Sequence, residues 1–582
     1  LGAGASEVFW IRAVVNATDE SVLPFNTTIV TDQGPDILAT DDTVVRSDAP
    51  LNVRVTTSSD PAEAGEELTY TIHYANQSSG PLTNVELRFV PSPDAPLPGG
   101  GEIVETIGTL AGGEGGTRVV STTVRNDVLE GAQLRATTQV LSTGDPEETR
   151  AETVTQTPVA AQTPLLVTMT VNPDPVRASE LLRTAVTVTN RGSEAKTFDV
   201  LLTLPFAMTR IPQVLPGSNI SNDGACDGAC DPQDVVRWSV TDLRPGASEV
   251  FWIRNEVLSG GVVARPNGFL IAYDAEVRSG DDVPIRASGT TRIKSSRALN
   301  LSVDTSSHPA VEGQELTYTI HYANQSGDVL NPVVLTFTPP EDAPLPGGGS
   351  RTLDLGALAD GAGGIEVITV NVDDPLAAGS QLQALAEIEV TSNRDGKTRA
   401  VTQTPVADEE SPLLVTMTVN PDPVRAGELL KAAATVTNRG DEAKTFDVLL
   451  TLPLGMTRIP QAAQGSNVSN DGACDSACDP RDGVRWSVVD LPPGESELVW
   501  MRSGVLTGGA GARDEGFLIT YDAEVRGTDG APVRASGATR IRTDRLLNLR
   551  VDASAHPTDE GEQLTYTIHY ANQSGGDLSP VV

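Results

Sequence analysis

The stretch Leu316-Thr-Tyr-Thr-Ile-His-Tyr-Ala-Asn-Gln-Ser326 decides the fold, because apolar and polar residues alternate along it. Successive side chains of a β-strand point to opposite faces of the sheet. Leu316, Tyr318, Ile320 and Tyr322 therefore share one buried face, whereas His321 lies with the polar residues on the outward face. The pattern predicts a half-buried β-strand.

The same stretch also begins at Leu68 and Leu564, and 316 − 68 and 564 − 316 both equal 248. A second signature, Leu165-Leu-Val-Thr-Met-Thr-Val-Asn-Pro-Asp-Pro-Val-Arg177, returns at Leu413 with the same spacing. Two module types, A and B, therefore alternate within each 248-residue repeat, and each has about the length of one β-sandwich. The predicted A modules are 51–161 and 299–409, and the predicted B modules are 162–298 and 410–546.

The two ends of the sequence resemble partial modules. Residues 1–50 match the C-terminal part of a B module, since Glu7–Arg12 repeats Glu249–Arg254, and 547–582 match the N-terminal part of an A module. Half a sandwich exposes its inner sheet face and its unpaired edges. We therefore expect a window of a longer array, with strand exchange between chains as the alternative.

The composition favours many short strands separated by turns. Aromatic residues make up 4% of the chain, whereas there are 54 glycines and 40 prolines. No segment has a helical period of apolar residues over more than two turns. The sequence therefore predicts an all-β fold of tandem immunoglobulin-like β-sandwiches in an extended array.

The net charge of −37 argues against a nucleic-acid partner, because a polyanion would be repelled. The acidic charge fits either solubility of an extended chain or cation uptake at acidic loops. No run of about 18 apolar residues predicts a membrane span in this segment. No signal peptide is visible at residue 1, which we interpret as a mature or partial chain in the extracellular space.

The A module resembles a family of bacterial surface repeats known as domain of unknown function eleven. The resemblance rests on Glu312–Gly327, which is similar to the family's Gly-x-x-Leu-Thr-Tyr-Thr-Ile pattern, and on Leu353–Leu358. In module A, Thr336–Pro340 departs from the family pattern. Module B is similar to a divergent member of the family at Thr187–Gly192. The resemblance implies immunoglobulin-like spacers on a bacterial cell surface or in a matrix, and it implies no catalytic residue.

Each B module carries one close pair of cysteines in a Gly-rich loop, Cys226 with Cys230 and Cys474 with Cys478. This spacing allows the two Cα atoms to approach the roughly 5.5–6 Å that a disulfide needs. A disulfide would suit an oxidising exterior. Free thiols and a metal site are the alternatives, although a zinc site would need further ligands and no histidine lies nearby.

The same loops carry repeated aspartates that could bind calcium, which prefers carboxylate and carbonyl oxygens. Their spacing of four does not match an EF-hand loop, so a solvated turn is the alternative. No cofactor other than calcium is expected. The candidate ligands are Asp223, Asp227, Asp231, Asp234, Asp471, Asp475, Asp479 and Asp482.

Other residues give no sign of catalysis. Five tryptophans occupy equivalent strand positions of the B modules, where core packing is expected and sugar stacking is the alternative. The sequence contains no nucleophile elbow, zinc-protease motif or phosphate-binding loop, so we expect no enzyme. The tryptophans are Trp10, Trp238, Trp252, Trp486 and Trp500.

We expect an extracellular structural protein that forms a rod, stalk or filament on or around a bacterial cell. Short proline-containing junctions, Thr155–Val159 and Thr402–Val406, would join modules that contact only their neighbours in sequence. The expected partners are neighbouring repeats, other copies of the chain, and a surface or matrix ligand. The alternative function is an adhesin whose B-module loops bind calcium, a glycan or a host protein.

Overall fold

A computed structural model describes most of the 582 residues. The described residues are 22–30, 37–44, 50–143, 149–160, 163–178, 180–205, 213–214, 219–221, 235–258, 265–280, 284–377, 379–391, 393–407, 411–453, 456, 461–463, 467–469, 483–507, 513–527, 532–542, 547–553, 565–572 and 576–579.

The fold class predicted from the sequence is confirmed, because the described residues form strands and turns and contain no helix. Eight sheets of three to five strands pair into four β-sandwiches, and two further hairpins stand alone. The chain divides into two units, one of 1–162 with 265–272 and one of 163–264 with 273–582. We name the sandwiches A1 (51–160), B1 (165–292), A2 (299–407) and B2 (413–540).

The first unit contains sandwich A1 and one hairpin. Its smaller sheet has the order β3-β5-β8, its larger sheet has the order β4-β10-β9-β6-β7, and the hairpin is β1-β2. The strands are β1 (Val22–Ile29), β2 (Ile37–Val44), β3 (Leu51–Thr57), β4 (Ala62–Glu63), β5 (Glu67–Asn76), β6 (Leu82–Val90), β7 (Ile103–Leu110), β8 (Gly115–Thr123), β9 (Gln133–Ser142) and β10 (Thr149–Ala160).

Sandwich B1 pairs a sheet of order β11-β12-β17-β14 with a sheet of order β15-β16-β13-β18-β19. The ring centroids of Trp238 and Phe251 lie 5.4 Å apart between these sheets, so Trp238 packs in the core as predicted. The strands are β11 (Leu165–Asn172), β12 (Leu181–Asn190), β13 (Lys196–Thr203), β14 (Gln213–Val214), β15 (Asn219–Ser221), β16 (Val235–Leu243), β17 (Ser248–Glu256), β18 (Leu270–Arg278) and β19 (Ile285–Arg292).

Sandwich A2 repeats the topology of A1, with sheets of order β20-β22-β25 and β21-β27-β26-β23-β24. Strand β22 is the stretch that opened the sequence analysis, and its residues Leu316, Tyr318 and Ile320 are buried in the core as predicted. The strands are β20 (Leu299–Thr305), β21 (Ala310–Val311), β22 (Glu315–Asn324), β23 (Leu330–Thr338), β24 (Arg351–Leu358), β25 (Gly363–Asn371), β26 (Gln381–Val390) and β27 (Asn393–Ala407).

Sandwich B2 repeats the topology of B1, and a terminal hairpin β37-β38 follows it. The B2 sheets have the orders β28-β29-β34-β31 and β32-β33-β30-β35-β36. The strands are β28 (Leu413–Asn420), β29 (Leu429–Asn438), β30 (Lys444–Thr451), β31 (Gln461–Ala462), β32 (Asn467–Ser469), β33 (Gly483–Leu491), β34 (Ser496–Gly504), β35 (Leu518–Gly527), β36 (Val533–Arg540), β37 (Leu547–Ala553) and β38 (Tyr566–Asn572).

The strand orders are those of an immunoglobulin-type sandwich. In each A sandwich the first, second and fifth long strands form one sheet, and the remaining strands form the other. A short early strand pairs in parallel with the last strand, β4 with β10 and β21 with β27. The B sandwiches have the same parallel contact as isolated bridges, Val176 to Ile293 and Val424 to Ile541.

The proline-containing segments predicted as junctions belong to strands. Thr155–Val159 lies inside β10, and Thr402–Val406 lies inside β27. Pro158 stands opposite Gln133 and Pro405 stands opposite Gln381, at the ends of their antiparallel ladders. Proline is tolerated there because few ladder hydrogen bonds remain for a backbone N–H to make. The prediction that these segments link modules is therefore wrong.

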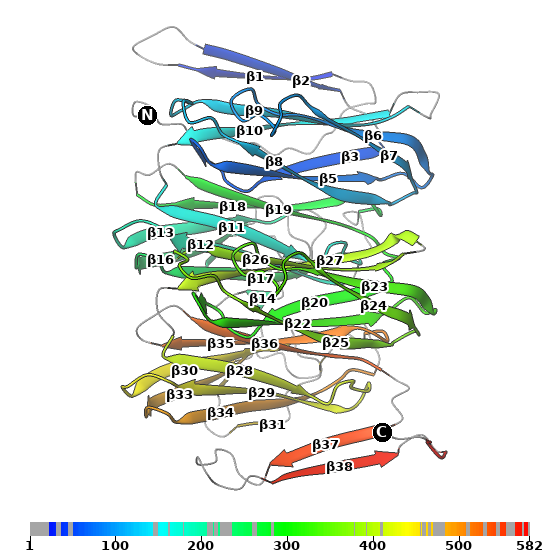
Figure 1. Cartoon of the computed structure of the whole chain (residues 1–582), viewed down its shortest axis with the longest axis vertical. Helices are drawn as coiled ribbons and strands as arrows, with labels where there is room; N and C mark the ends of the chain where they lie inside the picture. Colours follow the sequence, from blue (N-terminus) through cyan, green and yellow to red (C-terminus); the bar gives the residue numbers. More distant parts are fainter. Residues whose placement is uncertain are drawn as a thin grey trace. The chain divides into compact units, whose positions relative to one another are not determined.

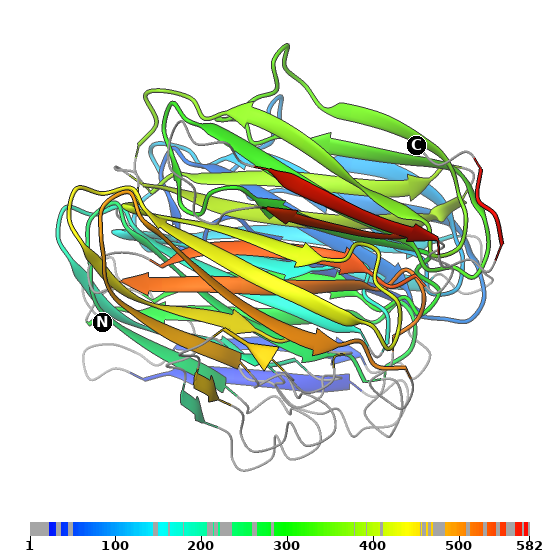
Figure 2. The same ribbon diagram turned by 90° about the horizontal axis from the view of Figure 1, so that it is seen from below.

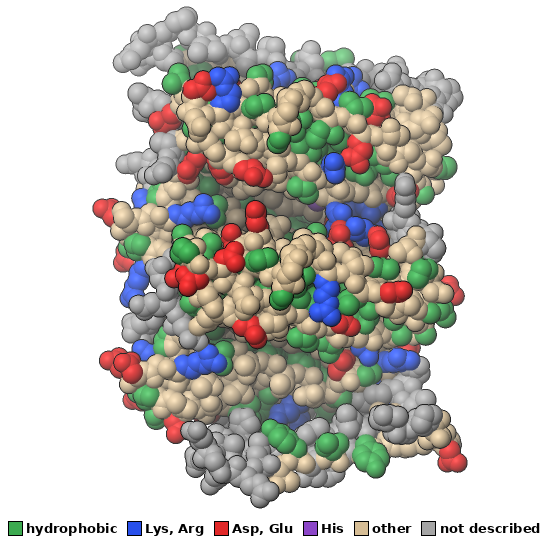
Figure 3. Space-filling model, viewed as in Figure 1, with side chains coloured by type: hydrophobic (Ala, Val, Ile, Leu, Met, Phe, Trp, Pro, Cys, Tyr) green, Lys and Arg blue, Asp and Glu red, His purple; other side chains and the backbone are tan. Residues whose placement is uncertain are grey.

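Within the second unit the sheets lie in layers with their strands running across the stack, and Figure 2 looks along this stack (Figures 1 and 2). Side chains of opposite charge are interspersed on the face of the molecule drawn in Figure 3. Among the described residues drawn there, basic side chains therefore lie beside acidic ones.

Candidate functional site

The site residues predicted from the sequence lie outside the described residues. This holds for both cysteine pairs, Cys226 with Cys230 and Cys474 with Cys478, and for all eight candidate calcium ligands. Across the described ranges, no group of three or more His, Cys, Asp or Glu side chains could hold a metal ion. Those ranges also contain no helix that could span a membrane.

The best-defined polar sites are the contacts between sandwiches inside the second unit. B1 contacts A2, its neighbour in sequence, and it also contacts B2, which is one module further along the chain. Contacts in this unit therefore extend beyond successive modules, which differs from the predicted nearest-neighbour array. The reason is that sheet faces carry contacts as well as the connecting segments.

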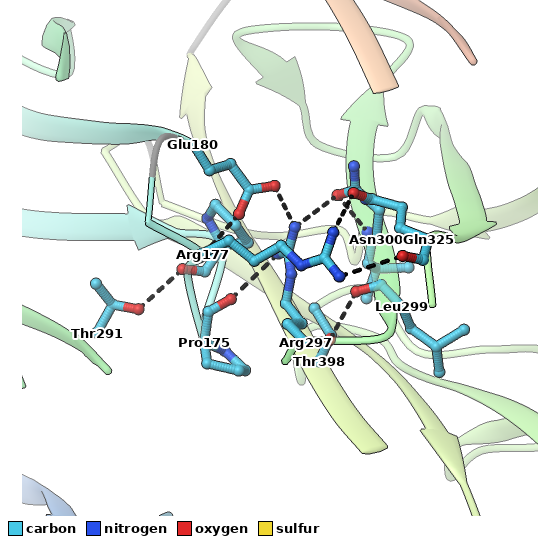
Figure 4. A network of polar contacts seen from close by, with 11 residues as sticks. Pro175, Arg177, Glu180, Thr291, Arg297, Leu299, Asn300, Gln325 and Thr398 are labelled. Atoms are coloured by element: carbon cyan, nitrogen blue, oxygen red, sulfur yellow. Dashed lines mark hydrogen bonds and ion pairs between the residues drawn. The ribbon is translucent and has the colours of Figure 1, made fainter. Parts of the chain in front are cut away.

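The segment that connects B1 to A2 is held by a buried ion pair with B1 (Figure 4). The Arg297 side chain is 1% exposed and pairs with the carboxylate of Glu180. Arg297 Nη1 also donates to the carbonyl oxygen of Pro175 at 3.1 Å, and its Nη2 donates to Asn300 Oδ1 at 3.4 Å. Burial lowers the pKa of Arg297, and the charge of Glu180 opposes this effect.

Further hydrogen bonds extend this network across the same contact. Arg177 of B1 donates to Gln325 of A2, with Nη1 reaching Oε1 and Nη2 reaching the backbone oxygen, both at 3.2 Å. The backbone N–H of Arg177 donates to Glu180 Oε2 at 2.9 Å. Glu180 therefore contacts the Arg297 side chain and the Arg177 backbone.

A short strand-like pairing also joins B1 to A2. Asn172 Nδ2 donates to the Val401 oxygen at 2.8 Å, and the Val401 N–H donates back to Asn172 Oδ1 at 3.0 Å. Asp174 and Arg399 exchange backbone hydrogen bonds of 3.2 and 2.7 Å in an antiparallel bridge. The start of B1 therefore extends the β27 edge of A2.

The contact of B1 with B2 carries a second buried ion pair. Arg254 of β17 pairs with Asp522 of β35, and the two side chains are 6% and 14% exposed. Arg183 Nη1 lies 3.5 Å from Asp522 Oδ1. Burial lowers the pKa of Arg254, while the charge of Asp522 opposes that shift. Asp522 therefore balances two arginines that would otherwise face each other.

Further ion pairs lie beside Arg254 and Asp522. Glu249 at the start of β17 lies 2.9 Å from Arg526 of β35, which also pairs with Glu524. Arg534 lies 2.8 Å from Glu524, and its Nη2 donates to the Val250 oxygen at 3.0 Å. Burial alone would raise the pKa of Glu524, but the two arginines outweigh it and hold the pKa below its usual range.

His321 is not exposed on the outward face as predicted, because that face is covered. Strands β35 and β36 of B2 contact β22 and β20, and His321 is 6% exposed. Its Nε2 lies 3.7 Å from Asp304 Oδ2, and Asp304 accepts a hydrogen bond from Ser536 of B2. Burial raises the pKa of Asp304, and His321 opposes this effect.

The tryptophans divide between two environments. Trp238 and Trp486 are buried in their cores, as predicted. Trp252 is 4% exposed, but it lies on the other side of its sheet from Phe251, beside Arg254 and facing B2. The prediction of core packing is therefore wrong for Trp252, because a second sandwich covers it.

A cavity of about 150 Å³ lies where B1, A2 and B2 meet. Its lining includes Arg183 and Arg254 from B1, Asn300 and Asp304 from A2, and Phe517 from B2. This mixture of charged, amide and aromatic side chains suits ordered water or a small polar molecule.

Sequence reasoning missed the charged residues at these contacts, although the repeat contains a signal for them. Arg254 and Asp522 each recur 248 residues away, as Arg502 and Asp274. Charged residues kept at equivalent positions in both B sandwiches would have suggested a recurring contact.

No family model matches the chain, so the resemblance to domain of unknown function eleven stays a prediction. No curated protein matches it either.

Solved structures show distant similarity. Escherichia coli alpha-2-macroglobulin activated by porcine elastase is 13% identical with a TM-score of 0.16, and the match covers 91% of this chain and 48% of that one. Salmonella alpha-2-macroglobulin reacted with methylamine is 11% identical with a TM-score of 0.18, covering 91% and 42%. A protein described as membrane-anchored from Corynebacterium diphtheriae is 10% identical with a TM-score of 0.17, covering 68% and 93%.

The chain spans less than half the length of these two macroglobulins. Identities and TM-scores this low assign no function to the chain.

Proposed function

We propose that the chain is an extracellular structural protein that forms a rod, stalk or filament on or around a bacterial cell, with no enzymatic role. The observation that carries this proposal is the double contact of B1 with A2 and B2. Domains joined by small polar contacts usually move relative to one another. Here the buried pair of Arg254 with Asp522 joins B1 to B2, and the pair of Arg297 with Glu180 fixes the segment between B1 and A2 against B1.

The 248-residue repeat supports a structural role, because the residues that make the contacts of B1 recur 248 positions later in B2. An array whose units repeat the same contact gains a constant rise and rotation per unit. Between B1 and B2 the repeated residues are Asn172 and Asn420, Arg177 and Arg425, Glu249 and Glu497, Trp252 and Trp500, and Arg254 and Arg502.

Electron microscopy of intact cells labelled with gold-tagged antibodies against the chain tests this function. We expect the label on fibres or a layer outside the cell, and we expect protease added to intact cells to remove it. Label confined to the cytoplasm, or label outside the cell without any extended structure, would contradict the proposal.

The adhesin alternative depends on the loops 222–234 and 470–482, which lie outside the described residues. It therefore stays a prediction from the sequence. Calorimetric titration of the chain with calcium tests it, because saturable heat at one site per 248-residue repeat is expected if those loops bind the ion.

A further inference from the structure

A groove of about 590 Å³ lies where the turn between β16 and β17 of B1 meets A2 and B2. It shares no lining residue with the smaller cavity described above. Sites for small molecules have volumes of roughly 300–1,000 Å³ and are often found between domains. The groove is therefore large enough to hold a small organic molecule.

The buried part of the groove lining is apolar and comes from all three sandwiches. An apolar surface of this kind favours a hydrocarbon ligand, because binding removes both apolar surfaces from water. Prolines in the lining offer no backbone N–H donor to a ligand. The buried apolar residues are Leu243 of B1, Val406 of A2, and Leu413, Val525 and Val533 of B2. The prolines are Pro245, Pro309, Pro405, Pro412 and Pro532.

Two basic side chains of the lining are free to meet a ligand. Arg244 lies in the B1 turn and is exposed, and Lys444 begins β30 of B2 and is half-buried. Neither forms an ion pair or a side-chain hydrogen bond in the part of the chain that the structure describes. Arg534 and Glu249 also line the groove, but both already pair with residues of β35. Asp242 adds one exposed carboxylate, so the charge left for a ligand is positive, in a chain whose net charge is −37.

We propose that this groove binds an amphipathic carboxylic acid, a molecule with a hydrocarbon body and one carboxylate. The hydrocarbon lies on the apolar lining, and the carboxylate meets Arg244 and Lys444. Hydrogen bonds between a charged donor and a carboxylate are among the strongest in proteins. A ligand with a cationic head group would instead be repelled by the two basic residues. The proposal adds a ligand to the proposed structural function and does not depend on it.

Calorimetric titration of the full chain with decanoate tests the proposal, at concentrations where the probe forms no micelles. Decyltrimethylammonium is the matched probe, because it has the same hydrocarbon length and the opposite charge. We expect saturable binding of decanoate and at least about tenfold weaker binding of decyltrimethylammonium.

Charge reversal in the groove should change this preference. We expect Arg244→Glu and Lys444→Glu each to weaken decanoate binding about tenfold or more, because a repulsion replaces an attraction. Neither substitution breaks an ion pair of the described residues, so the chain should stay folded. Arg485→Glu is the control and should leave binding unchanged, because Arg485 is exposed on B2 and does not line the groove.

A variant that does not depend on charge is Thr241→Trp, which adds a large side chain at an exposed position of the lining. We expect it to weaken both probes by filling the groove.

Decanoate that gives no saturable heat overturns the proposal. Equal binding of the two probes, or decanoate binding that Arg244→Glu and Lys444→Glu leave unchanged, overturns it as well, because either result indicates unspecific adsorption to apolar surface. Extracellular fibres of a chain that does not bind decanoate would remove this proposal and leave the structural function standing. Specific decanoate binding by a protein confined to the cytoplasm would do the reverse.

Discussion

Burial makes a few charged residues more important to stability than the many exposed charges of this acidic chain. Removing one partner of a buried ion pair leaves an uncompensated charge, whereas an exposed pair contributes little. Arg297, in the segment between B1 and A2, forms such a buried pair with Glu180 of B1. Arg237 and Asp199 form an exposed pair within B1.

We expect Arg297→Ala to destabilise the second unit by about 3–5 kcal/mol, because Glu180 would remain buried without its partner. Urea unfolding followed by tryptophan fluorescence measures the change. Arg237→Ala is the matched control and should cost less than about 1 kcal/mol. Similar effects of the two substitutions would show that the Arg297 pair is not buried in solution.

We expect the folded chain to lose stability in mild acid because of His308. Burial, followed by the charges of Arg534 and Arg183, lowers the pKa of His308 to about 3. The unfolded chain takes up this proton below about pH 6.5 but the folded chain does not, so stability falls as the pH drops from about 6.5 towards 3.

At pH 5 we expect His308→Gln to remove a penalty of about 2 kcal/mol. The measurement is the difference in unfolding free energy between variant and native chain at pH 5 and at pH 8. A difference that is equal at both pH values would contradict the lowered pKa.

The individual strands could be predicted from the sequence, but the sandwiches that pack on their outer faces could not. The period of two in β22 correctly placed Leu316, Tyr318 and Ile320 in the core. The same period separates the two faces of a strand without stating what lies on the outer one. His321 and Trp252 are buried by strands β35 and β36, which lie far along the chain, so local alternation could not reveal their environments.

The calcium and cysteine loops form the part of the predicted site that stays a prediction. Spacing within a loop limits which atoms can meet but does not fix where the loop lies. By contrast, the charged contact residues were accessible in principle, because the 248-residue repeat preserves them.

The loop before β35 of B2 lies close to A2. Gly516 has φ +78°, and a Cβ there would lie 2.2 Å from the backbone oxygen of Asn324 in A2. Gly494 of the same sandwich has φ +77° and no atom within 4 Å of an added Cβ. The two glycines therefore share a left-handed backbone conformation, and only Gly516 lies against a neighbouring sandwich.

We expect Gly494→Ala to cost about 1–2 kcal/mol from the left-handed backbone alone. Gly516→Ala should cost clearly more, because A2 or the loop must also shift. Thermal unfolding of the two variants provides the comparison, and equal losses would argue against the close approach of Gly516 to A2.

The hydrogen bonds of Asn172 to β27 can be tested against Asn420, the equivalent residue of B2. Asn172→Ala removes two hydrogen bonds to Val401, so we expect a cost of about 1–3 kcal/mol and faster amide hydrogen exchange at Val401. Asn420→Ala changes the equivalent exposed residue of B2 and should stay within about 0.5 kcal/mol. Unchanged exchange at Val401 would show that this pairing does not hold B1 to A2.

At the scale of the whole second unit, ion pairs such as Arg254 with Asp522 join B1 to B2. Asp522 balances Arg254 and Arg183, so reversing its charge places three positive groups at one contact. Such an arrangement is strongly unfavourable when the groups are shielded from water.

We expect Asp522→Lys to separate B2 from B1 and to increase the radius of gyration measured by small-angle X-ray scattering. Asp447→Lys is the control, because Asp447 pairs with Arg485 at the surface of B2. An unchanged scattering profile for Asp522→Lys would mean that other contacts hold the two sandwiches together.

The contact that skips one module has a mechanical consequence. Flexing the chain between B1 and A2 must also shear the face that B1 shares with B2, so one joint cannot move independently of the next. Bending resistance then depends on interlocked side chains rather than on linker length. We expect an array of such repeats to be stiff. Its persistence length should shorten when acid or charge reversal weakens the contact of B1 with B2.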